Sequence, residues 1–162
     1  MSVSDIENRS SELLLEKFLP YRLSLLSNTV SQGISAGYKS AYGLSVTEWR
    51  VVAILGRFPG LTASEVTQRG AMDKVAVSRA VNKLQSKSLI ERSPHQQDRR
   101  RLQLKLTTAK GLPLFRKIVP KALAYENQLL EALSKDELCL LDALIQKLQA
   151  SAEMVNKNNN TK

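Results

Sequence analysis

The sequence is short of the residues on which several kinds of protein chemistry depend. It has one cysteine and one histidine among 162 residues, Cys139 and His95. One cysteine excludes a disulfide within the chain, and one histidine leaves no partner for a histidine-based metal site. Phosphate-binding loops and nucleophile motifs are missing too, so we expect no metal, no cofactor and no enzyme activity.

Long apolar runs are missing as well. No stretch comes near the roughly 18 apolar residues of a membrane span. Residues 1–11 also lack the basic and apolar regions of a signal peptide. We therefore expect a cytoplasmic protein that does not bind membranes. The leucine-rich surroundings of Cys139 predict a small buried side chain there rather than a redox site.

Positive charge is present in excess and is unevenly distributed. The formal net charge is +9, and residues 69–110 account for +8 of it, with eleven Lys or Arg and three Asp or Glu. Such a local basic segment favours a polyanion partner, because neutralising phosphates requires cations that lie close together. Charge alone, however, fits a solvated surface equally well.

Apolar spacing predicts helices on both sides of the basic segment. Over residues 20–41 the apolar side chains recur every three or four positions, as on one helical stripe. A second helix follows, capped by Thr47 and ending at Pro59. After the basic segment, a long helix and a last helix from about Ser134 are expected. The last helix has an apolar stripe that needs a covering partner, formed by Leu138, Leu141, Ile145, Leu148 and Ala152.

Two short helices are predicted around a glycine at the start of the basic segment. Thr62 and Glu65 have the spacing of a capping box for the first helix, which ends at Gly70. Asp73 can cap the second helix, residues 74–87, which is basic and has an inward apolar stripe. Two helices with such a short connection indicate a helix-turn-helix.

The periodicity then changes from helical to alternating. Residues 101–107 alternate between apolar and polar side chains, as in a strand with one buried face, and residues 90–93 can pair with them. The tip of this hairpin carries Arg99 and Arg100, which suit the edges of a narrow minor groove. Asp98 fits an internal partner for a hairpin arginine, or a plain turn residue.

The second short helix carries side chains suited to the major groove of DNA. Arg79 could pair bidentately with guanine, and Asn82 with adenine. A thymine methyl contact is expected from Val75 or Ala76, and phosphate contacts from Ser78 and Lys83. The helix N-terminus near Lys74 adds backbone donors for a nearby phosphate. An ordinary amphipathic surface helix is the alternative, and the neighbouring basic hairpin argues against it.

Three segments resemble the MarR-type winged helix regulators of bacteria and archaea. They are MDKVAVSRAVNKL at 72–84, LIERSPHQQDRRRLQLKLT at 89–107 and EWRVV at 48–52. The family's aspartate followed by arginines corresponds to Asp98, Arg99 and Arg100. Its helix serine and arginine correspond to Ser78 and Arg79, whereas Ala76 stands where the family has threonine.

The resemblance implies a mainly α fold with a small β wing. It also implies a homodimer that binds pseudopalindromic double-stranded DNA, and most commonly a repressor released by a small phenolic or carboxylate ligand. The expected segments are N-terminal dimerisation helices at 1–44, a winged helix-turn-helix DNA-binding domain at 45–107, C-terminal dimerisation helices at 108–155 and a disordered tail at 156–162.

For the ligand of such a regulator we expect a pocket near the join between the dimerisation helices and the winged domain. The candidate residues are Arg22, Ser27, Ser31, Trp49 and Arg50. At this kind of junction, however, Trp49 and Arg50 more often have a structural role, in which they pack and brace the two parts. A different class of function, a winged helix scaffold that binds proteins and not specific DNA, remains the alternative to a regulator.

Overall fold

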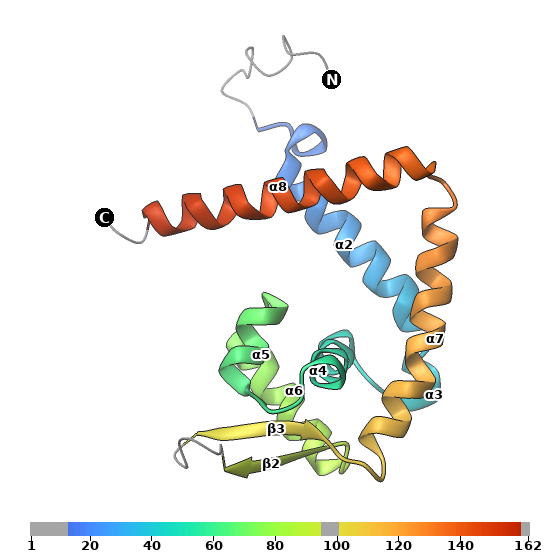
Figure 1. The fold of residues 1–162 in the computed structure, drawn as a ribbon, viewed down its shortest axis with the longest axis vertical. Coiled ribbons are helices and arrows are strands. Elements are labelled where there is room, and N and C mark those ends of the chain that lie inside the picture. The colour runs from blue at the N-terminus through green and yellow to red at the C-terminus, as the bar shows by residue number, and fades with distance from the viewer. Residues whose placement is uncertain (1–12, 95–100, 160–162) are drawn as a thin grey trace. The chain divides into compact units, whose positions relative to one another are not determined.

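The structure is a computed structural model that describes residues 13–94 and 101–159. It is mainly helical with a small antiparallel sheet, which confirms the predicted fold class (Figure 1). Its elements are η1 (Leu15–Lys17), α2 (Leu19–Ala36), α3 (Lys39–Tyr42), α4 (Val46–Arg57), β1 (Leu61–Thr62), α5 (Ala63–Gly70), α6 (Lys74–Ser86), β2 (Ile90–Pro94), β3 (Leu102–Leu106), α7 (Gly111–Leu130) and α8 (Lys135–Asn159).

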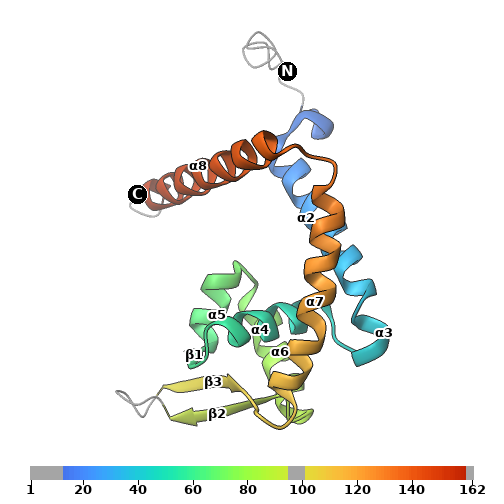
Figure 2. The ribbon, with the colours of Figure 1, turned by 45° about the vertical axis from the view of Figure 1, so that its right-hand side comes forward.

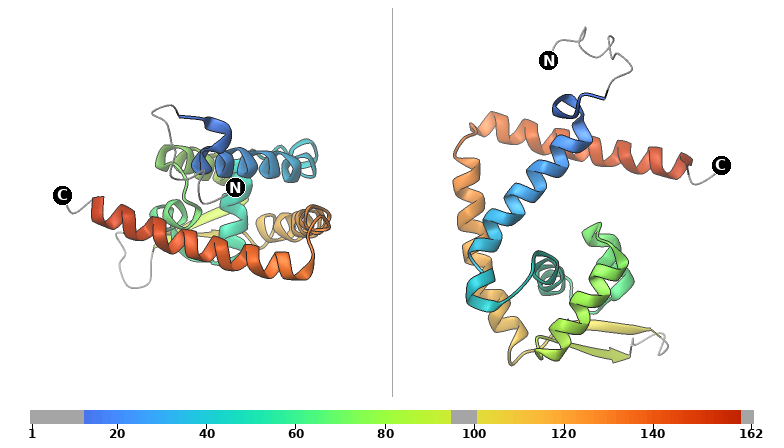
Figure 3. Two further views of the ribbon diagram at one scale, coloured as in Figure 1. Left: turned by 90° about the horizontal axis from the view of Figure 1, so that it is seen from above. Right: turned by 180° about the vertical axis from the view of Figure 1, so that it is seen from behind.

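The chain divides into two compact units, Met1–Ala122 and Leu123–Lys162, and α7 runs through the boundary between them. In the first unit, helices α4, α5 and α6 lie on one side of the sheet (Figures 1 and 3). The core of this unit lies between the helices and the sheet. Its fully buried side chains include Leu44, Val51, Val52, Leu55, Val66, Val77, Val81, Leu84, Ile90, Leu104 and Ile118.

The sheet has the strand order β1-β3-β2, and both pairings are antiparallel (Figure 2). The β2–β3 hairpin, called the wing below, confirms the predicted pairing. The alternation in β3 buries Leu104 and Leu106, but Leu102 is 49% exposed. Leu102 pairs with Pro94 at the end of the ladder. Strand β1 was not predicted, because two residues are too short to show a periodicity.

Three predicted caps are confirmed. Thr62 and Glu65 form the capping box of α5, and Ser134 and Glu137 have the reciprocal bonds of a capping box at the start of α8. Hydrogen bonds from Ser134 hold the pKa of Glu137 below its usual value. The Asp73 carboxylate accepts a 2.8 Å hydrogen bond from the Ala76 amide at the start of α6. Each cap needs partners three residues apart, which makes it visible in a sequence.

The predicted cap at Thr47 is wrong. Ser45 caps α4 instead, and its side chain and that of Glu48 each bond the other's backbone amide, with Glu48 N donating to Ser45 Oγ at 3.2 Å. The capping-box spacing, serine followed by glutamate three residues later, was present in the sequence. It outcompetes a lone threonine because it satisfies two free backbone donors rather than one.

The single helix predicted over residues 20–41 is also wrong. Helix α2 ends at Ala36, and a short turn separates it from α3. The turn places the Tyr38 side chain in the core, where it is 1% exposed. Burying this ring stabilises the turn by more than one further helical hydrogen bond would.

Two predictions about the second unit need correction. Helix α8 continues to Asn159, so residues 156–159 are helical rather than part of a disordered tail. Each residue added to a helix that has already formed gains a hydrogen bond at little further cost. Cys139 is exposed on α8 rather than buried, because α8 buries none of its residues within this chain. Among the described helices, none is long and apolar enough to cross a membrane.

Candidate nucleic-acid interface

Helix α6 has one buried and one exposed face. Val77, Ala80, Val81 and Leu84 pack into the core. The expected base and phosphate contacts lie on the exposed face, and they are Lys74, Val75, Ser78, Arg79, Asn82 and Lys83, whereas Ala76 is half-buried. Val75 is 55% exposed, which leaves its side chain accessible for contact with a thymine methyl group.

Arg79 makes no hydrogen bond or ion pair with the described residues. Asn82 lies three positions further along α6 and Ser78 one position earlier, so the three side chains share one side of the helix. The Asp73 cap leaves the other free amides of the first turn directed past Lys74, where they favour a phosphate. This exposed face therefore combines base-reading and phosphate-binding groups.

Lys83 is engaged within the protein. Its Nζ lies 2.8 Å from Oε1 of Glu48, and the Nζ of Lys87 lies 3.7 Å from Oε2 of the same carboxylate. Glu48 is 3% exposed and sits at the start of α4. The two ion pairs therefore join the C-terminal end of α6 to α4 through the buried Glu48 carboxylate. A phosphate contact by Lys83 stays a prediction, and it would have to compete with Glu48.

We expect Glu48→Gln to lower the free energy of unfolding by about 1–2 kcal/mol, because the amide can keep the cap but not two ion pairs. The loss should stay below that of a fully buried pair, since the Lys83 side chain is 57% exposed and can return to water. Urea unfolding measures it. Glu91→Gln, on the exposed edge strand, is the matched control. Equal stability of the two variants would contradict the role of Glu48.

Arg92 was not among the predicted site residues. It lies on β2, and its Nη2 donates a 2.8 Å hydrogen bond to Oδ1 of Asn82 on α6. The sequence did not predict this contact because Arg92 and Asn82 are ten positions apart on different elements. Their relative position is set only when the wing packs against α6. The signal available was a further cation within the basic segment.

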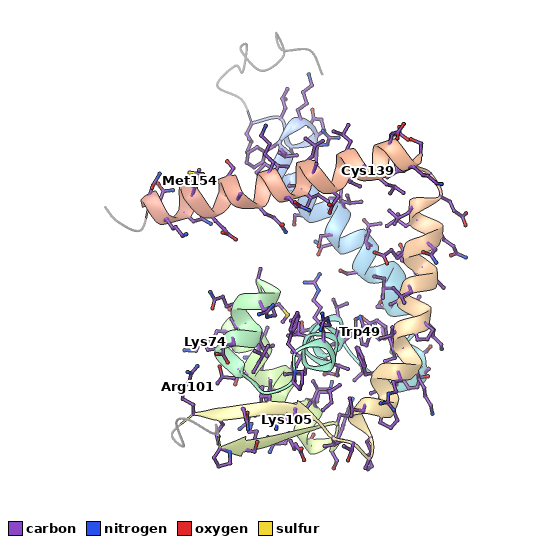
Figure 4. All side chains as sticks on the ribbon, in the orientation of Figure 1. Trp49, Lys74, Arg101, Lys105, Cys139 and Met154 are labelled. Carbon is purple, nitrogen blue, oxygen red and sulfur yellow. The ribbon has the colours of Figure 1, made fainter. Side chains whose placement is uncertain are left out.

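The wing is also joined to α5. Arg101 Nη2 lies 3.3 Å from Oε1 of Glu65. Figure 4 shows Arg101 and Lys74 at the same end of the helix layer, where the wing tip begins. The predicted wing residues Asp98, Arg99 and Arg100 lie outside the described residues, as does His95.

The predicted ligand residues are only partly brought together. Arg50 on α4 donates a 2.8 Å hydrogen bond from Nη2 to Ser31 Oγ on α2. Trp49 is 9% exposed and packs between two rings, those of Tyr38 at 5.5 Å and Phe115 at 6.4 Å. Figure 4 shows it beside α7. This packing agrees with a structural role for Trp49.

Arg22 and Ser27 lie on the exposed surface of α2. Ser27 is one helical turn before Ser31, about 6 Å along the helix, and Arg22 is roughly 13 Å before it. Sequence reasoning missed Tyr38, whose hydroxyl is buried and has no hydrogen-bond partner among the described residues. Burial raises the pKa of Tyr38, and the Arg50 charge opposes this in part, so the hydroxyl is neutral at pH 7.

Comparison with known proteins identifies the class to which this winged helix belongs. The model of the MarR family matches residues 42–101, from the last residue of α3 to the residue before β3. The HTH-type transcriptional regulator BilQ of Clostridium symbiosum is 31% identical over 111 residues, 68% of this chain and 76% of that protein. The chain belongs to the MarR family of DNA-binding transcriptional regulators.

Solved structures agree with this assignment. A MarR/EmrR family regulator from Acinetobacter sp. ADP1 is 28% identical, with a TM-score of 0.79 over 88% of this chain and 99% of that one. BpsR of Bordetella bronchiseptica is 18% identical, with a TM-score of 0.73 over 86% and 98% of the two chains, and shares the fold. DNA binding by BpsR is regulated by 6-hydroxynicotinic acid. The predicted family resemblance is confirmed.

Proposed function

We propose that this chain is a cytoplasmic, homodimeric repressor that binds a pseudopalindromic operator and is released by a small phenolic or carboxylate ligand. The observation that carries the proposal is the exposed face of α6. Arg79 there has no partner among the described residues, although α6 packs its opposite face into the core. A free guanidinium on a rigid helix is the group that reads guanine most often.

Exposed apolar residues support the dimer. On η1 and α2 they are Leu15, Leu19, Tyr21, Leu23, Leu25 and Leu26, and on α8 they are Leu140, Leu141, Leu144, Ile145, Leu148, Met154 and Val155. Single exposed leucines are ordinary, but stripes along two helices indicate surfaces that a partner covers. We assign residues 1–44 and 108–155 to dimerisation and 45–107 to DNA binding. Two copies of α6 would then meet half-sites about 34 Å apart.

Selection of bound duplexes from a random library tests the proposal. We expect enrichment of an inverted repeat and a stoichiometry of two chains per duplex. If the dimer makes 6–10 phosphate contacts, affinity should fall roughly 10³- to 10⁵-fold between 50 and 200 mM salt. Retention of no duplex even at low salt would overturn the proposal and favour the protein-binding scaffold.

Repression itself needs a separate test. A reporter gene placed behind a promoter that overlaps the selected sequence should be less active when the protein is present. Activation of that reporter would contradict the repressor assignment and leave sequence-specific binding standing.

The buried Tyr38 hydroxyl supports a ligand between α2 and α4. A neutral hydroxyl without a partner among the described residues is an energetic cost that a ligand oxygen could relieve. Arg50, held by Ser31, supplies a cation close enough to affect the Tyr38 titration and could bind a carboxylate. The precedent of BpsR agrees with a hydroxylated aromatic acid. Such a ligand releases DNA only if it prefers the conformation with wrongly spaced recognition helices.

We expect Tyr38→Phe to fold at least as stably as the wild type, and up to about 1 kcal/mol more stably, because it removes a buried hydroxyl without a partner. It should also weaken the response to an effector by roughly 2- to 12-fold, the value of one hydrogen bond. The measurement is the concentration of 6-hydroxynicotinic acid or 4-hydroxybenzoate that releases DNA. Tyr42→Phe, on a half-buried tyrosine, is the control. A destabilised Tyr38→Phe would show that the hydroxyl has a partner in solution.

A further inference from the structure

The hydrogen bond between Arg92 and Asn82 joins the wing to the DNA-facing side of α6. Arg92 Nη2 donates to Asn82 Oδ1 at 2.8 Å, and both side chains are exposed. A guanidinium has donors and no acceptor, so the group that faces it must be the carboxamide oxygen. The orientation of the Asn82 side chain therefore follows from the chemistry of its partner.

This orientation matters for base recognition. An asparagine that pairs with adenine accepts from the N6 amino group through its oxygen and donates to N7 through its nitrogen. Here the oxygen already accepts a charge-assisted hydrogen bond, which is stronger than a neutral one. Its second lone pair remains, but the adjacent cation opposes the approach of another positively polarised donor. The same cation polarises the amide and makes its amino group a better donor.

We propose that Arg92 determines the base preference of Asn82. With Arg92 in contact, Asn82 presents its amino group to the major groove and favours guanine O6 and thymine O4, which are acceptors, over the N6 amino donor of adenine. The proposal rests on the sequence-specific DNA binding proposed above, and it replaces the simple pairing of Asn82 with adenine that the sequence predicts. Arg92 acts through Asn82 and is a positioning residue.

A double-mutant cycle tests this directly. Duplexes are selected from a random library with the wild type, Arg92→Ala, Asn82→Ala and the double variant. We expect Arg92→Ala to raise the frequency of adenine at one base pair of each half-site by roughly 3- to 10-fold. In the Asn82→Ala background the same change should alter no base preference and weaken all duplexes alike.

Two control variants separate the hydrogen bond from the charge. Lys105→Ala removes a cation from the neighbouring strand β3 and should leave the base preference unchanged. Arg92→Lys keeps the charge on a flexible point donor without the planar guanidinium, so it should preserve most of the affinity and move the preference toward adenine less than Arg92→Ala does. If Arg92→Ala changes affinity uniformly in both backgrounds, the proposal is overturned and Arg92 is a phosphate contact.

A measurement without DNA distinguishes this inference from the proposed function. In the free protein, the NMR signals of the Asn82 side-chain amide should shift in Arg92→Ala and much less in Lys105→Ala. Unchanged signals would mean that the contact is absent in solution and would overturn the inference, whatever DNA the protein selects. Shifted signals in a protein that selects no common sequence would confirm the contact but overturn both the base preference and sequence-specific binding.

Discussion

Gly111→Ala should destabilise the protein by about 3 kcal/mol or more, the largest stability change that we expect from a single methyl group. A Cβ at this position would lie 2.0 Å from the carbonyl oxygen of Leu89 and 3.1 Å from Cβ of Leu106. The oxygen belongs to the backbone and cannot turn away as a side chain can. It also accepts a 3.0 Å hydrogen bond from the Thr107 amide, so moving it breaks a second contact.

The position of Gly111 couples this strain to DNA binding. Leu89 connects the end of α6 to β2, and Gly111 begins α7 directly against it. Moving the Leu89 backbone would shift the wing relative to α6. We therefore expect weaker DNA binding together with a melting temperature lower by roughly 6–12 °C.

Gly37→Ala is the matched control for Gly111→Ala. Its nearest new contact is the Ile34 carbonyl oxygen at 3.4 Å, which is ordinary van der Waals contact, and its backbone is right-handed helical with φ −74°. This variant should be unchanged or slightly more stable, since alanine restricts the unfolded chain. Circular dichroism during thermal unfolding compares the two variants. Similar melting temperatures would show that the Leu89 backbone adapts at little cost.

Arg79→Ala should have the largest effect on DNA recognition. The exposed guanidinium has no partner among the described residues, so its removal should change the free energy of unfolding by less than about 0.5 kcal/mol. Loss of a bidentate guanine contact costs about 1–3 kcal/mol, which is roughly 5- to 150-fold in affinity for each half-site. The preference for guanine at the contacted position should disappear.

Lys74→Ala separates this effect from a general loss of positive charge. Lys74 begins α6 on the same exposed side and is expected to bind phosphate. Its removal should weaken the preferred and the unrelated duplex alike and reduce the salt dependence by about one counterion. Fluorescence anisotropy with the selected operator and with base-substituted duplexes measures both variants. An unchanged affinity ratio in Arg79→Ala would mean that Arg79 binds backbone and reads no base.

The contrast between local and long-range contacts explains which parts of this site were predictable. The capping box of Thr62 and Glu65, the Asp73 cap and the buried stripe of α6 all follow from spacings of three or four residues. Such spacings act within one or two helical turns and are the same in any fold. Together with the clustered charge and the alternating wing, they determine a basic winged helix-turn-helix and place Arg79 on its open face.

Only the tertiary structure decided which side chains of the site have partners within the protein and which remain available for binding. Lys83 is paired with the buried Glu48, and the Asn82 side-chain oxygen accepts a hydrogen bond from Arg92. Tyr38 lies in the turn after α2 and buries its ring in the core. Each of these outcomes depends on elements that meet only after folding, because packing selects among partners that local periodicity treats as equivalent. The chain's own pattern thus specifies the helix presented to DNA, whereas the packing around it specifies which groups remain available for binding.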